Sequence, residues 1–404
     1  METECVEPLE SEAAPTSLPT WITVLLATAC GMIVASLYYV QPLIGPISAA
    51  LGLSAQAAGL IVTMTQIGYC ASLILVVPLA DILENRRLIV TALIASALAL
   101  TIAGISQHAS IFMLAMFFIG LSAVASQIVI PYASHLVAPI VRGHVIGNIV
   151  SGLMLGIMLA RPTASFLTGV GSWRTVFMLS AAGMAILATV LALVLPVRRP
   201  APSLAYSALL RSMMRLYIQT PLLRRRAFYQ AYLFSAFSLF WTTVPLLLAG
   251  PEFRLSQTGI AWFALAGVAG AIAAPIAGRL ADKGWTRPLT GFAIAIVAAS
   301  FLIAHGGTLG PAGRLGMLVI SAIVLDFGVS MNFVVGQRAI FALAPEYRGR
   351  LNGLYIATFF MGGAMGSAVG VWVFTQAGWS VTSRFGFALP VVALIYYATE
   401  RRES

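Results

Sequence analysis

Two charged side chains occur where the surrounding sequence is apolar. Asp326 stands twelve residues from Arg314 and twelve from Arg338, near the middle of a long apolar segment. Arg161 lies well inside another such segment. A charged group in an apolar medium is costly unless it is paired or has a function. We therefore expect Asp326 and Arg161 to carry the chemistry of this protein.

A carboxyl group at such a position can bind and release a proton. Removal from water raises the pKa of a carboxyl group and a nearby cation lowers it. We predict that Asp326 couples proton movement or ligand binding, and that Arg161 is its partner in one conformation. A static salt bridge, the wall of a solvated cavity, or an Arg161 side chain that extends to lipid phosphate are the alternatives.

Other polar and aromatic residues occur at similar depths in the apolar segments. Each either lines a cavity or forms an interhelical hydrogen bond, which contributes about 0.6 kcal/mol on average. The candidates for a substrate cavity are Tyr39, Gln66, Tyr69, Gln127, Trp241, Asn332 and Gln337. An apolar, aromatic cavity with a single charge pair suits an amphipathic or weakly charged organic solute better than a sugar or a polyanion.

The composition places these residues in a membrane. Of the 404 residues, 60% are hydrophobic and only 9% are charged, whereas soluble domains carry roughly 25% charged residues. The long uncharged stretches are sufficient for helices that cross about 30 Å of hydrocarbon. We predict an all-α membrane protein with twelve transmembrane helices in two pseudo-symmetric six-helix halves. The predicted helices span residues 21–44, 56–80, 87–105, 110–134, 144–169, 174–196, 227–249, 257–279, 287–306, 314–338, 350–376 and 380–399.

The basic residues predict the orientation of these helices. Eighteen Lys and Arg residues fall in loops on the side of the termini and four on the opposite side. Basic loops stay in the cytoplasm, so we expect both termini to be cytoplasmic in a multi-pass protein of the cell membrane. The net charge of +10 is distributed over short loops, which argues against a nucleic-acid partner.

A basic segment divides the chain into its parts. Residues 198–226 contain seven arginines and no acid, with apolar residues between them at helical spacing. The segment is either an amphipathic helix on the inner membrane surface or a solvated linker. The predicted parts are a disordered cytoplasmic tail (1–20), an N-terminal half (21–197), this linker (198–226), a C-terminal half (227–399) and a short tail (400–404).

The two halves share a sequence repeat. Arg142-Gly143, with Gly147 and Gly156 following, recurs 206 residues later as Arg348-Gly349 with its own glycines. Small residues at every fourth position share a helix face and permit close approach of another helix. The proposed helix-packing residues are Gly152, Gly156, Gly362, Gly366 and Gly370. We expect their helices to pack at a shared interface, either moving or static.

The loop motifs resemble the major facilitator superfamily over the whole chain. Leu79-Ala80-Asp81, followed by Arg86 and Arg87, is similar to the signature loop of that family, and Gly278 to Gly284 is similar to a second copy. The resemblance implies alternating access, a cavity lined by the fourth and tenth helices, and a cytoplasmic latch between the halves. The residues assigned to the latch are Asp81, Arg86, Arg142, Asp282, Arg287 and Arg348.

Further motifs resemble the proton-linked efflux branch of this family. They are Tyr38-Tyr39-x-Gln41-Pro42-Leu43, the region from Gly120 to Arg161, and Phe359-Phe360-x-Gly362-Gly363. The resemblance implies a monomeric secondary transporter that exports a small organic solute or drug in exchange for protons. Uptake by proton symport is the main alternative.

Other classes of protein find less support in the sequence. The four histidines are scattered and Lys283 is the single lysine, so neither metal-ligand spacing nor a Walker lysine motif is present. We therefore expect no enzymatic activity, no cofactor and no metal. A membrane-embedded enzyme or a non-transporting sensor remains the alternative from another class.

Overall fold

The computed structural model describes residues 18–200, 205–305, 310–343 and 347–400, and these residues are almost entirely helical. Residues 1–17 and 401–404, which make up most of the two predicted tails, lie outside the described residues. The helices of the first half are α1 (Thr20–Ala35), η1 (Gln41–Leu43), α2 (Ile44–Leu51), α3 (Ala55–Leu75), η2 (Val77–Asp81), α4 (Asn85–Ile105), α5 (Ala109–Ser122), α6 (Ala125–His135), α7 (Pro139–Val170) and α8 (Trp173–Val194). Those that follow are α9 (Tyr206–Gln219), α10 (Pro221–Ala249), α11 (Gln257–Ala264), η3 (Leu265–Val268), α12 (Ala269–Asp282), α13 (Thr286–Ala304), α14 (Pro311–Phe341) and α15 (Arg348–Ala398).

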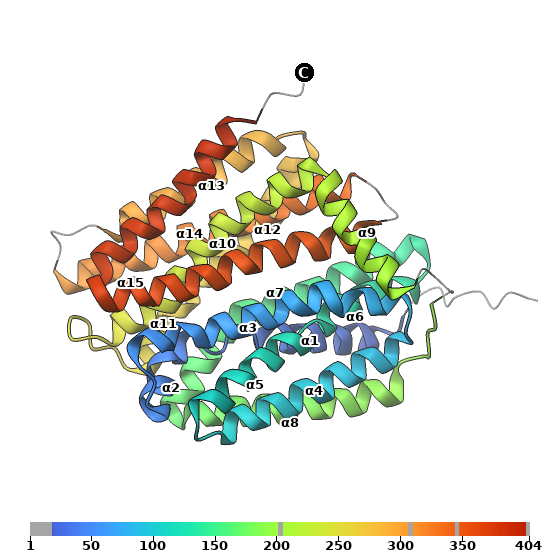
Figure 1. Ribbon diagram of the computed structural model, residues 1–404, viewed down its shortest axis with the longest axis horizontal. Helices are drawn as coiled ribbons and strands as arrows, with labels where there is room; N and C mark the ends of the chain where they lie inside the picture. Colours follow the sequence, from blue (N-terminus) through green and yellow to red (C-terminus); the bar gives the residue numbers. More distant parts are fainter. Residues whose placement is uncertain (1–17, 201–204, 306–309, 344–346, 401–404) are drawn as a thin grey trace, which may run out of the picture.

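The described helices confirm an all-helical membrane protein (Figure 1). Ten helical segments of the described chain are long and apolar enough to cross a membrane. The shorter apolar helix α1 supplies a further crossing together with η1 and α2. α15 supplies two crossings, because Gly378 has a φ of 71° and interrupts it. A residue with a Cβ is strained at such a φ, so glycine is what permits the sharp reversal between the last two crossings.

Several crossings that we expected to be continuous are broken, among them the first, the fourth and the eighth. The fourth is interrupted at Ala123 and Val124, between α5 and α6. The first one loses α-helical geometry after Ala35 and resumes through η1, in which Pro42 occupies the first turn. The eighth is broken by η3 between α11 and α12. Backbone that leaves the helix at membrane depth is tolerated where it is buried in protein. The breaks at η1 and η3 lie beside the Arg161 side chain described below, so they are part of the construction of that site.

The glycine stripes pack within each half rather than between the halves. A Cβ at Gly156 of α7 would overlap the carbonyl oxygen of Gly31 on α1. In the same way, a Cβ at Gly366 of α15 would overlap the carbonyl oxygen of Ser235 on α10. The fifth and eleventh crossings therefore approach the first and seventh to backbone contact. The two halves repeat this arrangement, as the sequence repeat indicates.

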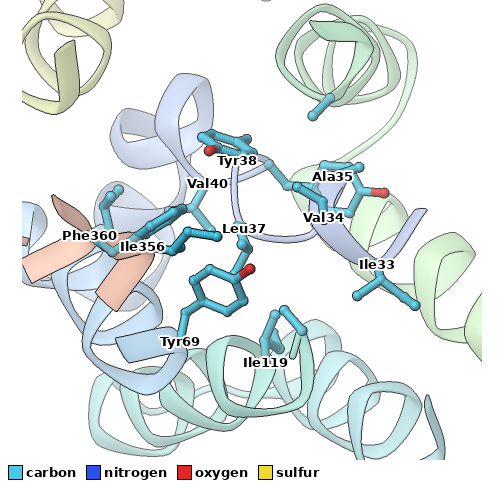
Figure 2. Close-up of a cluster of buried hydrophobic side chains, with 14 of the residues drawn as sticks. Ile33, Val34, Ala35, Leu37, Tyr38, Val40, Tyr69, Ile119, Ile356 and Phe360 are labelled. Carbon is cyan, nitrogen blue, oxygen red and sulfur yellow. The ribbon is translucent and has the colours of Figure 1, made fainter. Parts of the chain in front are cut away.

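Contacts between the halves are concentrated where α3 and α15 run side by side (Figure 1). The hydroxyl groups of Thr63 and Ser367 are 2.9 Å apart, and Gln66 Nε2 donates to Ser238 Oγ at 3.1 Å. Figure 2 shows Tyr69 of α3 close to Phe360 of α15, with ring centroids 4.7 Å apart. The halves thus meet through both apolar and hydrogen-bonded contacts.

The predicted linker contains α9, which packs on α10, α15 and η2. We call the end of the bundle that carries α9 the linker side and the opposite end the far side. Leu209 and Met213 of α9 are buried, whereas Met214 and Ile218 are exposed. α10 begins at Pro221, before the predicted start at residue 227. The prediction followed the apolar part of the helix, and the arginines of the first turns precede that part.

The end of the described chain is anchored by charge. The carboxylate of Glu400 accepts hydrogen bonds from Arg226 Nη2 at 3.0 Å and from Tyr229 Oη at 2.9 Å. Arg225 Nε lies 3.8 Å from the same carboxylate. Arg287 Nη2 donates to the backbone carbonyl of Glu400 at 2.7 Å. This cluster joins the end of α15 to α10 and α13.

Candidate functional site

Arg161 is at the centre of the bundle, and only 2% of its side chain is exposed. Arg161 belongs to α7, and its side chain reaches η1, where Arg161 Nε donates to Gln41 Oε1 at 2.6 Å. Its guanidinium carbon lies 5.2, 4.8 and 4.4 Å from the ring centroids of Tyr38, Phe237 and Trp241. A desolvated cation–π contact is worth about 2 kcal/mol or more. These rings and Gln41 hold the guanidinium in place away from water.

Asp326 reaches the same place from α14 in the other half. Its side chain is 6% exposed, and its Oδ2 lies 4.0 Å from Arg161 Nη1. Trp241 Nε1 donates to the other oxygen, Oδ1, at 2.7 Å. The charges therefore attract one another in a buried environment, where Coulomb interactions are strong. At 4.0 Å they do not share a hydrogen bond.

A glycine in η3 provides the space for this pair. A Cβ on Gly267 would lie 2.9 Å from Asp326 Oδ2, 3.2 Å from the Trp241 ring and 3.3 Å from Arg161 Nη1. Any larger residue would have to displace the carboxylate or the guanidinium. The backbone of η3 at Gly267 therefore lies directly against both charged side chains. Glycine commonly permits such close approach of the backbone to a functional group.

Several buried polar atoms around the site have no hydrogen-bond partner among the described residues. They include Arg161 Nη2, Gln41 Nε2 and Gln66 Oε1. The great majority of buried polar groups in proteins are hydrogen-bonded. A ligand or a second conformation can supply the partners that these atoms lack here.

The structure separates the seven predicted cavity residues into different places. Trp241 contacts the ion pair directly, and Gln66 bridges the halves as described above. Tyr39 lies apart from them and lines a groove of about 480 Å³ between α1 and α7. Asn332 Nδ2 donates to Gln230 Oε1 at 2.7 Å within the second half.

The remaining three belong to one hydrogen-bonded chain on the linker side. Gln127 Nε2 donates to Tyr69 Oη at 3.1 Å, and Asn352 Nδ2 approaches Gln127 Oε1 at 3.5 Å. Gln337 Nε2 donates to Asn352 Oδ1 at 2.8 Å. These hydrogen bonds connect the first half to the second on the linker side of the ion pair.

The predicted latch residues also have particular partners. Asp81 lies 3.6 Å from Arg350 of α15, which is a contact between the halves. Arg350 also donates to Ser212 of α9 at 3.2 Å. The contacts of Arg86 and Arg287 are elsewhere: Arg86 donates to the carbonyl of Leu195, and Arg287 to that of Glu400. α4 and α13 direct these two side chains into their own halves.

The other predicted latch residues lie at the surface of the linker side. Asp282 forms an ion pair with Arg338 of the same half. Arg348 Nε donates to the carbonyl of Phe341 at 3.0 Å, and Arg142 is exposed. The ion pair that joins the halves on the linker side is therefore formed by Asp81 and Arg350, and Arg350 is not among the predicted latch residues.

Sequence reasoning also missed side chains at the centre. Gln41, Tyr38, Phe237 and Gly267 all contact the ion pair or its partners. Gln41 and Tyr38 belong to the Tyr38 to Leu43 segment, and Gln41 stands next to Pro42, a residue that ends regular helix. A polar residue beside a proline inside an apolar segment was the signal that could have identified it.

Fold and site together define the class of protein. Within the described structure, two six-helix halves surround the buried pair of Arg161 and Asp326, each half contributing one member. The Major Facilitator Superfamily model matches residues 24–313 and 234–404. The chain therefore belongs to the Major Facilitator Superfamily, and it is a multi-pass membrane transporter.

Comparison with individual proteins agrees with this assignment. The uncharacterized transporter YgaY of Escherichia coli O157:H7 is 38% identical over 93% of this chain and 94% of its own length. The solved structure of the nucleoside transporter NupG has a TM-score of 0.75 at 16% identity and covers 93% of this chain and 99% of its own. That of the human organic anion transporter MFSD10 (TETRAN) has a TM-score of 0.68 at 18% identity and covers 94% and 100%.

Proposed function

We propose that the protein is a proton-coupled transporter of a small organic solute in the cell membrane, with the linker side and both termini in the cytoplasm. The observation that carries the proposal is the buried contact of Arg161 and Asp326, one from each half. A pair of this kind is affected whenever the halves move apart, and alternating access requires such movement around a midplane site. Asp326 is the proton-binding residue, and Arg161 responds to its charge.

Proton binding at Asp326 changes what the pair can hold together. The ionised carboxylate attracts Arg161, and the protonated one does not. Trp241 and Gln41 keep each residue anchored in both cases. Protonation therefore weakens the contact between Asp326 and Arg161. Asp326 keeps its hydrogen bond with Trp241, and Arg161 keeps its hydrogen bond with Gln41.

Two directions of transport are consistent with this centre. The resemblance of the Tyr38 to Leu43 segment to the efflux branch supports export by proton antiport, which is our first proposal. Uptake by symport is the second candidate, because the free donors on Arg161 and Gln41 allow a solute to bind together with a proton. Solute accumulation in cells that lack or overproduce the protein distinguishes the two.

Asp326→Asn tests the proton coupling. Solutes that raise the melting temperature of the purified protein are selected first, since a ligand that binds the native state stabilises it. Their transport is then measured in proteoliposomes with and without a proton gradient. We expect the variant to fold with a melting temperature close to that of the wild type and to lose gradient-driven accumulation, because asparagine cannot ionise.

The matched control is Gln337→Glu, which adds a carboxylate on the same helix nearer the linker side. Placed in the Asp326→Asn background, it is expected not to restore the response to a proton gradient. Gradient-driven transport by Asp326→Asn at the wild-type rate would contradict the proposed role of Asp326.

A further inference from the structure

The two orphan groups nearest the ion pair are both donors. Arg161 Nη2 and Gln41 Nε2 are buried without a partner among the described residues, on side chains that are 2% and 0% exposed. Leaving a buried donor unsatisfied costs about 1–3 kcal/mol, and more for a charged group. Two such donors on contacting side chains indicate that the missing partner is a hydrogen-bond acceptor.

The geometry of the Arg161–Gln41 contact fixes where these donors are. Arg161 Nε donates to Gln41 Oε1, so the reverse orientation of the amide would set two donors against one another. The Nε–H and one Nη2–H of a guanidinium are parallel along one edge, the edge that binds carboxylates in a bidentate manner. Gln41 occupies half of this edge and leaves the Nη2 half available.

The charges at the site determine which acceptor fits. The charged and titratable groups that interact with Asp326 within the described structure are Arg161 on α7 and Tyr38 before η1. α10 adds the neutral Trp241 and η3 adds the Gly267 backbone. With Arg161 and Asp326 both ionised, an added anion leaves one negative charge uncompensated, whereas a proton on Asp326 restores neutrality.

We propose that the transported solute is a small organic anion with one carboxylate and an apolar body, which binds Arg161 and Gln41 while Asp326 carries a proton. This inference rests on the proposed function, because it takes the ion pair as the place where solute and proton meet. The rings of Tyr38, Phe237 and Trp241 provide the apolar surroundings. Anion and proton then bind together and cross in the same direction, which selects symport, the second candidate given above, over export by antiport.

The test uses matched probes that differ in charge. Aliphatic and aromatic monocarboxylates, including benzoate and octanoate, are compared with the amide and the amine of the same skeleton by thermal shift and calorimetry. We expect carboxylates to bind more tightly at about pH 6 than at about pH 7.5, where the free carboxylates remain ionised throughout. Their amides are expected to bind more weakly, and the amines not at all.

Variants assign this binding to the site. Arg161→Gln is expected to lower carboxylate affinity by about tenfold or more, the equivalent of about 1.4 kcal/mol. Asp326→Asn is expected to make the affinity independent of pH, because its neutral side chain resembles the protonated acid. Arg174→Gln is the control: it removes an arginine that stacks on Trp173 of α8 and donates to Gly104, and it should leave carboxylate affinity unchanged.

Three results would overturn the proposal: no carboxylate binds, an amine binds better than its carboxylate, or Arg161→Gln keeps the wild-type affinity. If an amide or amine is transported and its transport still requires Asp326, the solute class is wrong while the proposed proton coupling stands. If gradient-driven transport does not depend on Asp326, the proposed function itself fails.

Discussion

Each charge at the centre of the molecule has a neutral partner of its own. Gln41 accepts a hydrogen bond from Arg161, and Trp241 donates one to Asp326. The two charges are 4.0 Å apart, so their interaction is Coulombic and has no hydrogen-bond geometry to lose. Removing one partner of a buried ion pair normally leaves an uncompensated charge. The separate anchors reduce that cost here and allow the pair to separate.

Gly267→Ala tests how closely this pair is fitted. The new Cβ would lie 2.9 Å from Asp326 Oδ2, and overpacking of this kind costs about 1–3 kcal/mol. We expect the carboxylate to move away from Arg161 and the rate of gradient-driven transport to fall, as measured in proteoliposomes. Gly316→Ala on α14, where a Cβ meets nothing within 4 Å, is the control. Equal transport by both variants would show that the fit at Gly267 is not important.

The helices that carry the site are positioned by contacts between their backbones. α7 carries Arg161, and its glycines allow it to lie directly on α1. α15 lies on α10 in the same way, and α10 carries Trp241 and Phe237. Backbone cannot move aside as a flexible side chain can, so the depth of these contacts fixes the position of the site within each half.

Gly156→Ala is expected to destabilise the protein, because its Cβ would overlap the Gly31 carbonyl and force α7 away from α1. The expected loss is about 1–3 kcal/mol of unfolding free energy. Gly147→Ala on the same helix meets nothing within 4 Å, and there the change should stabilise the helix by about 0.5–1 kcal/mol. Reversible unfolding in detergent measures both. A stabilising effect at Gly156 would refute the packing argument.

At the scale of the whole molecule, the two halves touch at both ends. On the linker side Asp81 lies near Arg350, and on the far side Ser165 Oγ donates to the carbonyl of Gln257 at 2.8 Å. The ion pair lies between these contacts and is almost fully buried. Opening on one side therefore requires that its contacts between the halves separate while those of the other side persist.

Arg350→Gln should favour the conformation that is open on the linker side, because it removes the charge that attracts Asp81. A cysteine introduced at Asn332, in a background without Cys5, Cys30 and Cys70, reports the opening through its rate of maleimide labelling. We expect faster labelling in Arg350→Gln. Arg348→Gln, whose arginine contacts the Phe341 carbonyl of its own half, is the control and should label at the unchanged rate. Slower labelling in Arg350→Gln would contradict the assignment.

The sequence was sufficient for the architecture because a chain in hydrocarbon must satisfy its backbone within helices. Arg161 and Asp326 were identifiable for a related reason, since charges inside apolar segments are rare. The break at η3 was not predicted, because Leu265–Val268 is as apolar as the helices that flank it. The break at η1 was missed although Gln41 and Pro42 gave a signal for it. Phe237 and Gly267 were missed because aromatic residues and glycines occur throughout the chain, and only tertiary packing selects the ones that touch the pair.

The anchoring of Glu400 has a consequence for biosynthesis. Three arginines on α10 and α13 meet the final described residue of the chain. Ribosomes make these arginines long before Glu400, so the C-terminal half can form this contact only after Glu400 has emerged from the ribosome. Until then the three arginines are without this acidic partner, and the end of α15 is not yet joined to α10 and α13.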